Sequence, residues 1–299
     1  MGISKEDILP IIMSALREDV GSGDITNASV FDKDTSITAC IIAKEPCVLA
    51  GIDIARWVFD VLDEKINFRP LAKDGDVVKK GKKVASLRGS VKNILTGERT
   101  ALNFLGALCG IATLTKSFVD EIKGTKAGIF DTRKTMPGMR ALAKHAVKVA
   151  GGSNHRTGLW DGILIKDNHI YCSTPHHKGA GHRLQVLGSS ESVIAGLVRK
   201  SKAKGYKNVE IEVENLKEFK EALEAGADII LLDNMKIEDA RKAVSLKNKR
   251  KGPRPLLEYS GGVRLGNVRR IAKTGVDRIS IGFLTHSAPS IDLSLEICP

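Results

Sequence analysis

Aromatic residues are scarce in this chain. Phe, Trp and Tyr together make up 4% of its 299 residues, and no stacking motif of the RNA-recognition type occurs. Proteins that bind single-stranded nucleic acid commonly stack bases on exposed aromatic rings, so this scarcity weakens a nucleic-acid role. Apolar runs of about 18 residues are absent as well, and Met1 to Asp7 lack the basic and apolar segments of a signal peptide. We expect a soluble cytoplasmic protein with neither a nucleic-acid nor a membrane partner.

Cysteine is also sparse and irregularly placed. The five cysteines are scattered, odd in number and without C-x-x-C spacing. This pattern excludes a disulfide framework and a cysteine zinc site, and it fits a reducing compartment. Three histidines lie close together in a glycine-rich segment: His176, His177 and His182. They could bind a transition metal, but an exposed loop is the favoured interpretation of this segment.

The charge of the chain is strongly unbalanced, at +12. Such an excess fits nucleic acid, an anionic membrane or acidic substrates, and net charge alone does not choose among them. The densest basic run, Lys247 to Arg254, contains Pro and Gly and is typical of a solvated connecting loop. No phosphate loop of the form G-x-x-x-x-G-K-[ST] occurs, which removes support for one common nucleotide fold.

The first third of the chain predicts a small α+β domain. Apolar residues at helical spacing predict a helix from Ser4 to Asp19, and strands are predicted at Ser36 to Ala43 and Val48 to Gly51. The turn residues of Asp74 to Gly81 predict a hairpin.

A long helical stretch from Leu95 to Ile122 follows, and we expect it to connect two domains. Gly106 and Gly110 within it permit either the close approach of another segment or a kink.

Beyond this helix, short apolar runs alternate with helical segments, which predicts parallel β/α units. The six runs are Gly128 to Phe130, Gly162 to Ile165, Val209 to Val213, Ile229 to Leu232, Leu256 to Leu257 and Arg278 to Ile281. Almost every run ends in a polar or glycine cluster, and the ligand site of a β/α barrel lies at the C-terminal ends of its strands. We predict a barrel or a close relative. The alternative is an open doubly wound sheet, whose site would centre on a switch point.

Two stretches place five cationic side chains beside these runs. Asp131 to Arg140 holds three of them, and Asn154 to His169 holds two together with two histidines. Arginine and lysine concentrated at strand ends indicate a pocket for a small ligand with several negative charges. The sequence therefore predicts a substrate rich in carboxylate and phosphate.

These motifs, taken in order, resemble the quinolinate phosphoribosyltransferases nearly end to end. The matching segments are Gly23–Thr26, Glu98–Asn103, Asp131–Arg140, Asn154–His169, Glu210–Glu214, Leu232–Asn234, Ser260–Gly262 and Ile279–Ser287. The resemblance implies an α/β fold with an N-terminal α/β sandwich domain, residues 1–116, followed by an incomplete (open) α/β barrel, residues 117–286. A tail of about residues 287–299 is expected to pack back on the first domain.

The family's reaction joins quinolinate to phosphoribosyl pyrophosphate and requires magnesium (Mg2+). It gives nicotinate mononucleotide, pyrophosphate and carbon dioxide, a step of de novo NAD biosynthesis. By resemblance, Arg133, His155 and Arg156 hold the two carboxylates of quinolinate with help from Lys134, and bidentate guanidinium pairing suits that task. The family's shared sites imply a homodimer, or a hexamer, in which Arg99 reaches the neighbouring subunit's pocket.

The resemblance also implies roles on the phosphoribosyl side. Glu212 and Asp233 match positions that stabilise an oxocarbenium-like transition state and help to hold magnesium, while Lys166 and Lys134 neutralise the pyrophosphate. These four residues form the expected catalytic set. The pyridine nitrogen is itself the nucleophile, so positioning and charge suffice without a general base.

Glycines are expected to bind the ribose 5-phosphate through backbone N–H groups. The residues implied are Ser260, Gly261, Gly262 and Gly282, and the first three precede a predicted helix from Leu265 to Thr274. Tyr259, next to this loop, stands where the family has a small residue, and Met136 stands where it has threonine.

Three other functions remain open at this point. Two are paralogous enzymes on the same fold, a nicotinate phosphoribosyltransferase and a pyrophosphorylase-like protein associated with molybdate transport. The third is a basic protein that binds nucleic acid without catalysis. The joint presence of Arg99, Arg133, His155, Arg156 and Lys166 favours the dicarboxylate substrate.

Overall fold

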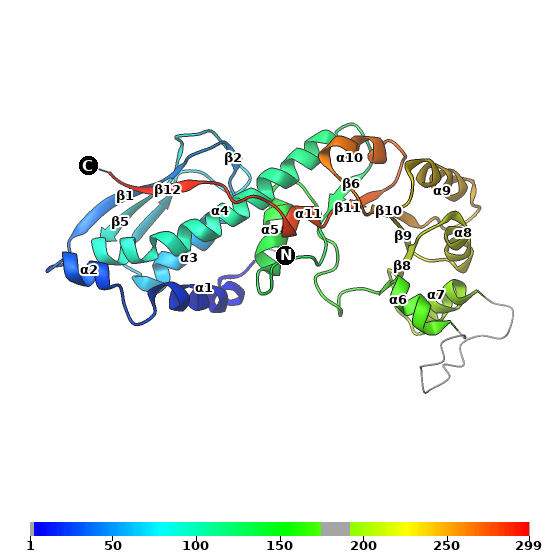
Figure 1. Cartoon of the computed structure of the whole chain (residues 1–299), viewed down its shortest axis with the longest axis horizontal. Coiled ribbons are helices and arrows are strands. Elements are labelled where there is room, and N and C mark those ends of the chain that lie inside the picture. The colour runs from blue at the N-terminus through cyan, green and yellow to red at the C-terminus, as the bar shows by residue number, and fades with distance from the viewer. Residues whose placement is uncertain (1–2, 175–191, 299) are drawn as a thin grey trace. The chain divides into compact units, whose positions relative to one another are not determined.

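The computed structural model describes residues 3–174 and 192–298, and the group His176, His177 and His182 lies outside them. The chain forms two compact units (Figure 1). Unit 1 comprises Met1–Ser117, Lys134–Asn154 and Gly282–Pro299, and unit 2 comprises Phe118–Arg133 and His155–Ile281.

Unit 1 contains an antiparallel sheet whose strands are ordered β12-β1-β5-β3. Its strands are β1 (Ser36–Ala43), β3 (Asn67–Pro70), β5 (Lys83–Ser90) and β12 (Leu293–Cys298), beside a two-stranded sheet of β2 (Cys47–Val48) and β4 (Val77–Val78). Its helices are α1 (Lys5–Val20), α2 (Ile25–Val30), α3 (Ile52–Leu62), α5 (Arg140–Val149), α11 (Phe283–His286) and most of α4 (Val91–Glu121), which continues into unit 2 from Phe118, as predicted for a helix that connects two domains. The C-terminal strand β12 pairs with β1, so the end of the chain belongs to the sheet of its beginning.

Local chemistry accounts for the first helix. Ser4 caps α1 by accepting the Asp7 N–H at 3.2 Å, and Ile8, Ile12 and Leu16 are buried on one face. The helix ends where Gly21, at φ +54°, donates its N–H to the Arg17 carbonyl. The helix predicted over this segment is confirmed.

Helix α4 is the longest element, and it has the length and apolar character of a membrane span. However, 61% of its apolar window is buried inside the fold. Added Cβ atoms at Gly106 and Gly110 would meet the carbonyls of Ile291 and Pro289, so these glycines let the C-terminal segment lie directly on the helix. The close approach predicted at these two positions is confirmed.

The hairpin predicted at Asp74 to Gly81 is confirmed in its flanking strands. Strands β3, before this segment, and β5, after it, are antiparallel neighbours, with Pro70 opposite Ala85. The connection between them is longer than a tight turn, because it includes β4, which pairs with β2. Its end is held against β1: Ala43 accepts the Gly81 N–H at 2.7 Å and donates its own N–H to the Lys82 carbonyl at 3.0 Å.

Unit 2 contains a six-stranded parallel sheet ordered β6-β11-β10-β9-β8-β7. Its strands are β6 (Gly128–Phe130), β7 (Leu164–Ile165), β8 (Glu210–Val213), β9 (Ile229–Asp233), β10 (Leu256–Ser260) and β11 (Arg278–Ser280). Its helices are α6 (Asp167–Ser173), α7 (Val193–Ala203), α8 (Leu216–Ala225), α9 (Ile237–Lys249) and α10 (Leu265–Ala272). Helices α8, α9 and α10 lie outside strands β8 to β11 (Figure 1).

The strand order distinguishes a barrel from a doubly wound sheet. Strands β7 to β11 are neighbours in chain order, and β6, the first in sequence, pairs with β11, the last. A doubly wound sheet would instead reverse its order at an internal switch point. Within the described residues β6 and β7 do not pair, so the barrel is open between them. The predicted fold class, a sandwich-like unit followed by an open α/β barrel, is confirmed.

A partly buried charge cluster lies at the N-terminal edge of the sheet in unit 2. Asp277 accepts the Leu257 N–H at 2.8 Å and pairs with Lys126 at 2.9 Å and with Lys247. Burial by itself would raise the pKa of Asp277, but the N–H and the two ammonium groups lower it. This cluster lies at the opposite ends of the strands from the predicted ligand site.

Candidate active site

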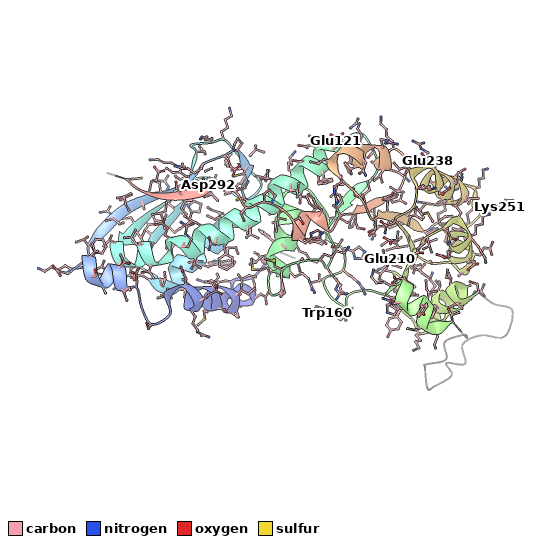
Figure 2. All side chains as sticks on the ribbon, in the orientation of Figure 1. Glu121, Trp160, Glu210, Glu238, Lys251 and Asp292 are labelled. Carbon is pink, nitrogen blue, oxygen red and sulfur yellow. The ribbon has the colours of Figure 1, made fainter. Side chains whose placement is uncertain are left out.

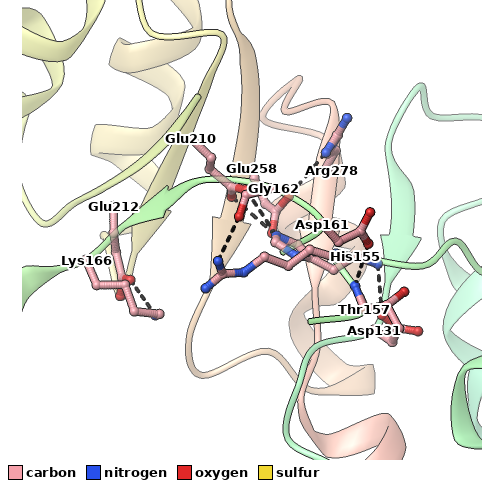
Figure 3. Close-up of polar contacts among 11 residues, drawn as sticks. Asp131, His155, Thr157, Asp161, Gly162, Lys166, Glu210, Glu212, Glu258 and Arg278 are labelled. Atoms are coloured by element: carbon pink, nitrogen blue, oxygen red, sulfur yellow. Dashed lines mark hydrogen bonds and ion pairs between the residues drawn. The ribbon is translucent and has the colours of Figure 1, made fainter. Parts of the chain in front are cut away.

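The C-terminal strand ends of unit 2 bring together most of the predicted site residues. These are Arg133, His155, Arg156, Lys166, Glu212, Asp233, Ser260, Gly261 and Gly262. Figure 2 shows Glu210 inside unit 2, whereas Glu238 and Lys251 lie on its outside. Figure 3 shows the polar contacts that surround His155.

The other three predicted residues belong to unit 1. Arg99 is exposed on α4. The backbone carbonyl of Lys134 accepts the Thr285 hydroxyl at 2.8 Å, and Gly282 is the N-cap residue of α11. Within unit 1, Lys134 and the Gly282 turn are thus tied together through Thr285.

Two guanidinium groups lie near each other in unit 2. Arg133 follows β6, and Arg156 precedes β7 and donates from Nη1 to the Gly162 carbonyl at 2.9 Å. Burial and the charge of Arg133 lower the pKa of Arg156, and the Nε atoms of both arginines are buried without a hydrogen-bond partner. Glu210 offsets part of this repulsion at Arg156, but the two buried Nε donors remain without an acceptor. Neighbouring like charges with unused buried donors are costly unless an anion joins them, so this pair suits an acidic ligand.

His155 lies between two buried carboxylates. Its Nε2 atom is 3.2 Å from Glu210 Oε2 and 3.4 Å from Glu258 Oε1, and Glu258 Oε2 is 3.9 Å from Arg278 Nη1 (Figure 3). The backbone N–H of His155 donates to Asp131 Oδ1 at 2.8 Å, and Asp131 is fully buried at the end of β6. Four strand ends are thus linked through one histidine.

The proton on His155 is placed by its contacts. Burial would lower the pKa of His155, but the hydrogen bond to Glu210 and the charges of Glu210 and Glu258 outweigh burial and raise it, so the two glutamates hold a proton on Nε2. The second nitrogen carries no proton, because the Arg156 backbone N–H donates to Nδ1 at 2.8 Å. We therefore assign the ring from this geometry as the Nε2–H form, with its proton facing the carboxylates.

The same three side chains have ligand atoms within 4.8 Å of one another, the spacing of a metal site. Metal on Nε2 of His155 would leave the ring with no proton, because Nδ1 already accepts the Arg156 N–H. Metal-bound histidines ordinarily donate from their second nitrogen. The arrangement fits a shared proton better than a metal ion.

Lys166 and Glu212 form the shortest charged contact of the site. Lys166 Nζ is 2.6 Å from Glu212 Oε2; the glutamate side chain is 12% exposed and the lysine 44%. Lys166 ends β7 and begins α6, where its backbone N–H donates to His169 Nδ1 at 2.9 Å. This is a helix-capping role for His169, a residue of the predicted motif.

Asp233 and the glycine loop lie at neighbouring strand ends. Asp233 is the register partner of Ser260, and its carboxylate accepts the Asn234 side-chain N–H at 2.8 Å. Asn234 has φ +50°, and a Cβ on Gly261, at φ +89°, would collide with its carboxamide. The loop after β10 is therefore shaped by Asn234 and can present backbone N–H groups at the start of α10.

Tyr259, where the family has a small residue, is accommodated inside the barrel wall. Its side chain is buried, and its hydroxyl donates to the Met235 carbonyl at 2.5 Å. Burial raises its pKa. The tyrosine supports the loop after β9 and leaves the Ser260–Gly262 loop in its predicted place after a strand and before a helix.

The sequence did not predict the roles of three residues around His155. Asp131 accepts the His155 backbone N–H, Glu258 faces the His155 ring, and Arg278 faces Glu258. Glu258 interrupts the apolar run Leu256–Leu257 and is fully buried in β10. A charged residue flanked by strand-forming residues was the available signal. Its two charged neighbours are distant in the sequence: His155 lies about a hundred residues before it and Arg278 lies twenty residues after it. The sequence alone therefore does not identify them.

Comparison with known proteins gives consistent matches. The family description "Quinolinate phosphoribosyl transferase, N-terminal domain" matches residues 24–109, and its C-terminal counterpart matches residues 111–296. The chain is 38% identical over 289 residues to the nicotinate-nucleotide pyrophosphorylase (carboxylating) of Mycobacterium leprae, covering 96% of this chain and 95% of that protein.

Two solved structures are similar over nearly the whole chain. The nicotinate-nucleotide pyrophosphorylase of Francisella tularensis is 39% identical, with a TM-score of 0.87, and the match covers 99% of this chain and 98% of that one. That of Ehrlichia chaffeensis is 38% identical, with a TM-score of 0.87 and full coverage of both chains.

Proposed function

We infer the reaction from the quinolinate phosphoribosyltransferase family, to which this chain belongs. The protein is a phosphoribosyl glycosyltransferase, which transfers phosphoribosyl from phosphoribosyl pyrophosphate to quinolinate with decarboxylation. The products are nicotinate mononucleotide, pyrophosphate and carbon dioxide, a step of de novo NAD biosynthesis. The paralogous and nucleic-acid-binding alternatives are not favoured.

The observation that carries the substrate assignment is the arginine pair. Arg133 and Arg156 lie close enough for each charge to affect the other, and each has a buried Nε without a partner. A ligand with two adjacent carboxylates supplies two negative charges and the acceptors that both forks need. We place quinolinate against this pair, with His155 and Lys134 completing its surroundings.

The chemistry then needs no protein nucleophile. The pyridine nitrogen attacks the anomeric carbon as pyrophosphate leaves, and positive charge develops on the ribose ring. We assign Glu212 and Asp233 to stabilise this charge and Lys166 with Lys134 to stabilise the departing pyrophosphate. The alkylated ring nitrogen then stabilises the carbanion that remains when the adjacent carboxylate leaves as carbon dioxide.

We propose that Glu212 and Asp233 also hold Mg2+. They end neighbouring strands, β8 and β9, and supply hard carboxylate oxygens, one half-buried and the other beside Asn234. Magnesium is commonly bound by one or two carboxylates together with substrate phosphates, so this donor set fits. The ion would neutralise charge on the pyrophosphate group.

We propose that the ribose 5-phosphate binds the loop Ser260–Gly262. This loop lies next to Asp233 in the sheet register and precedes α10, whose N-terminal N–H groups favour an anion. Gly282 is the further residue assigned to the phosphate.

Arg99 gives the proposal a quaternary element. It is exposed on α4 in unit 1, and we propose that it completes the pocket of a second copy in a homodimer or in a hexamer. We further propose that the protein acts in the cytoplasm, without nucleic-acid or membrane partners.

The deciding experiment offers quinolinate and nicotinate in parallel to purified protein with phosphoribosyl pyrophosphate and magnesium. Mononucleotide and carbon dioxide are both measured. We expect equimolar mononucleotide and carbon dioxide from quinolinate and no mononucleotide from nicotinate. Turnover of nicotinate alone would overturn the substrate assignment, and folded protein inactive toward both would overturn the proposed reaction.

A further inference from the structure

A buried acidic group surrounds His155, formed by Glu210, Glu258 and Arg278 and called here the His155 cradle. Glu258 is fully buried, and its two oxygens have no hydrogen-bond partner, since Arg278 is 3.9 Å away. Glu210 is 4% exposed and lies 3.2 Å from the histidine. None of these three residues is assigned a role in the reaction above.

The cradle is a poor device for stability. Two carboxylates are buried beside one neutral ring and one distant guanidinium, and desolvation of such groups commonly costs more than their attraction returns. An expensive arrangement next to a binding pair indicates a functional reason.

The contacts lead from the cradle to the two arginines. Glu210 accepts the Nε2 proton of His155, and the Glu258 carboxylate adds a second negative charge 3.4 Å from the same nitrogen. This fixes Nδ1 as an acceptor for the Arg156 N–H at 2.8 Å. The His155 N–H in turn donates to Asp131, two residues before Arg133, at 2.8 Å. The orientation of the His155 ring therefore sets the backbone position of Arg156. The bond from His155 to Asp131 connects this segment to the one that carries Arg133.

We propose that Glu210 and Glu258 are positioning residues for quinolinate: they hold the His155 ring, and through it the backbone of Arg156, so that the two guanidinium groups meet the two carboxylates. This proposal deepens the proposed function and rests on it. It parallels the way in which a buried carboxylate orients a catalytic histidine in other enzymes.

The test replaces Glu210 by Met, which keeps its length but removes the acceptor, and by Gln, which keeps one acceptor oxygen. For Glu210→Met we expect the KM for quinolinate to rise about tenfold or more, because the hydrogen bond from His155 to a charged group is lost. The KM for phosphoribosyl pyrophosphate and kcat should stay within about twofold. Glu210→Gln should restore most of the quinolinate affinity. Calorimetric titration with quinolinate measures the same effect without turnover.

Asp74→Asn is the matched control, since it removes the carboxylate partner of a different histidine, His145, at 2.8 Å in unit 1. It should lower Tm and leave both KM values unchanged. If Glu210→Met is not obtained folded, Glu258→Met, which removes the second negative charge beside Nε2, carries the same expectation.

Unchanged quinolinate binding in the folded Met variants would overturn the proposal, as would equal weakening for both substrates. Failure of the proposed function gives a different result, because the unaltered protein would then not turn over quinolinate. Calorimetry would still compare quinolinate binding to the unaltered protein and to the cradle variants.

Discussion

The arginine pair makes a quantitative prediction for Arg156→Lys. Lysine keeps the positive charge but loses the planar fork, so one of two parallel charge-assisted hydrogen bonds to a carboxylate cannot form. Such a bond contributes about 1.5–3 kcal/mol, which corresponds to a rise of roughly 10- to 100-fold in the KM for quinolinate. The contact from Nη1 to the Gly162 carbonyl, at 2.9 Å, is lost in the same change and adds disorder of the side chain.

The assay is steady-state turnover with each substrate varied in turn. We expect the KM for phosphoribosyl pyrophosphate to stay within about twofold, because Arg156 is assigned to the other substrate. Arg250→Lys is the matched control: Arg250 also has a buried Nε without a partner and also donates from Nη1 to a backbone carbonyl, that of Leu223, but it lies after α9. That variant should alter Tm and leave both KM values unchanged.

Two results would refute the reasoning. One is an Arg156→Lys variant that is folded and has an unchanged KM for quinolinate, because the fork would then have no role in binding. The other is a similar rise in quinolinate KM for Arg250→Lys, because the effect would then come from general loosening of unit 2.

Three further predictions follow from the structure. Gly261→Ala should raise the KM for phosphoribosyl pyrophosphate and lower stability by about 1–3 kcal/mol, measured by kinetics and thermal unfolding, because φ is +89° and the new Cβ would meet Asn234. The pKa of Asp74 is lowered: burial raises it, but the His145 contact at 2.8 Å and two backbone N–H groups outweigh burial. Its stabilisation is therefore complete above about pH 4 and lost as pH falls further, so Asp74→Asn should lower Tm at pH 7 and flatten the acid limb of Tm against pH. Glu212→Gln should lower kcat and raise the magnesium concentration needed for half-maximal rate, and an unchanged magnesium dependence would remove Glu212 from the ion's ligands.

The fold was predictable where its signal was local. Short apolar runs ending in polar clusters identified all six strands of the barrel, because parallel strands are buried on both faces. The apolar run predicted only Leu256–Leu257, whereas strand β10 continues to Ser260. The charged residue Glu258 interrupts the apolar pattern, so the second half of the strand was not recognised. The turn residues at Asp74 to Gly81 identified the connection between the antiparallel strands β3 and β5, but the pairing of β4 with β2 inside that connection depends on residues about thirty positions earlier and was not predicted.

The site was predictable in part for a similar reason. Arg133, Arg156 and Lys166 stand in dense cationic motifs at strand ends, so composition and resemblance both indicate them. The contacts of Glu258 and Arg278 depend on the register of β10 against β11, which no spacing in the sequence encodes. Sequence patterns identify the groups that meet a ligand, whereas the groups that orient them emerge only from packing.

The Lys166–Glu212 pair links the two halves of the proposed reaction. Lys166 is assigned to the pyrophosphate and Glu212 to the ribose and magnesium, yet the two side chains contact each other at 2.6 Å. Because the lysine is 44% exposed, their attraction is screened and worth about 0–1 kcal/mol, so its loss costs little. A substrate that brings both negative phosphate and developing positive charge gives each side chain a stronger partner. From the proposed roles we therefore expect the pair to keep two charges at their places before binding and to separate as phosphoribosyl pyrophosphate enters, which would couple its binding to assembly of the catalytic set.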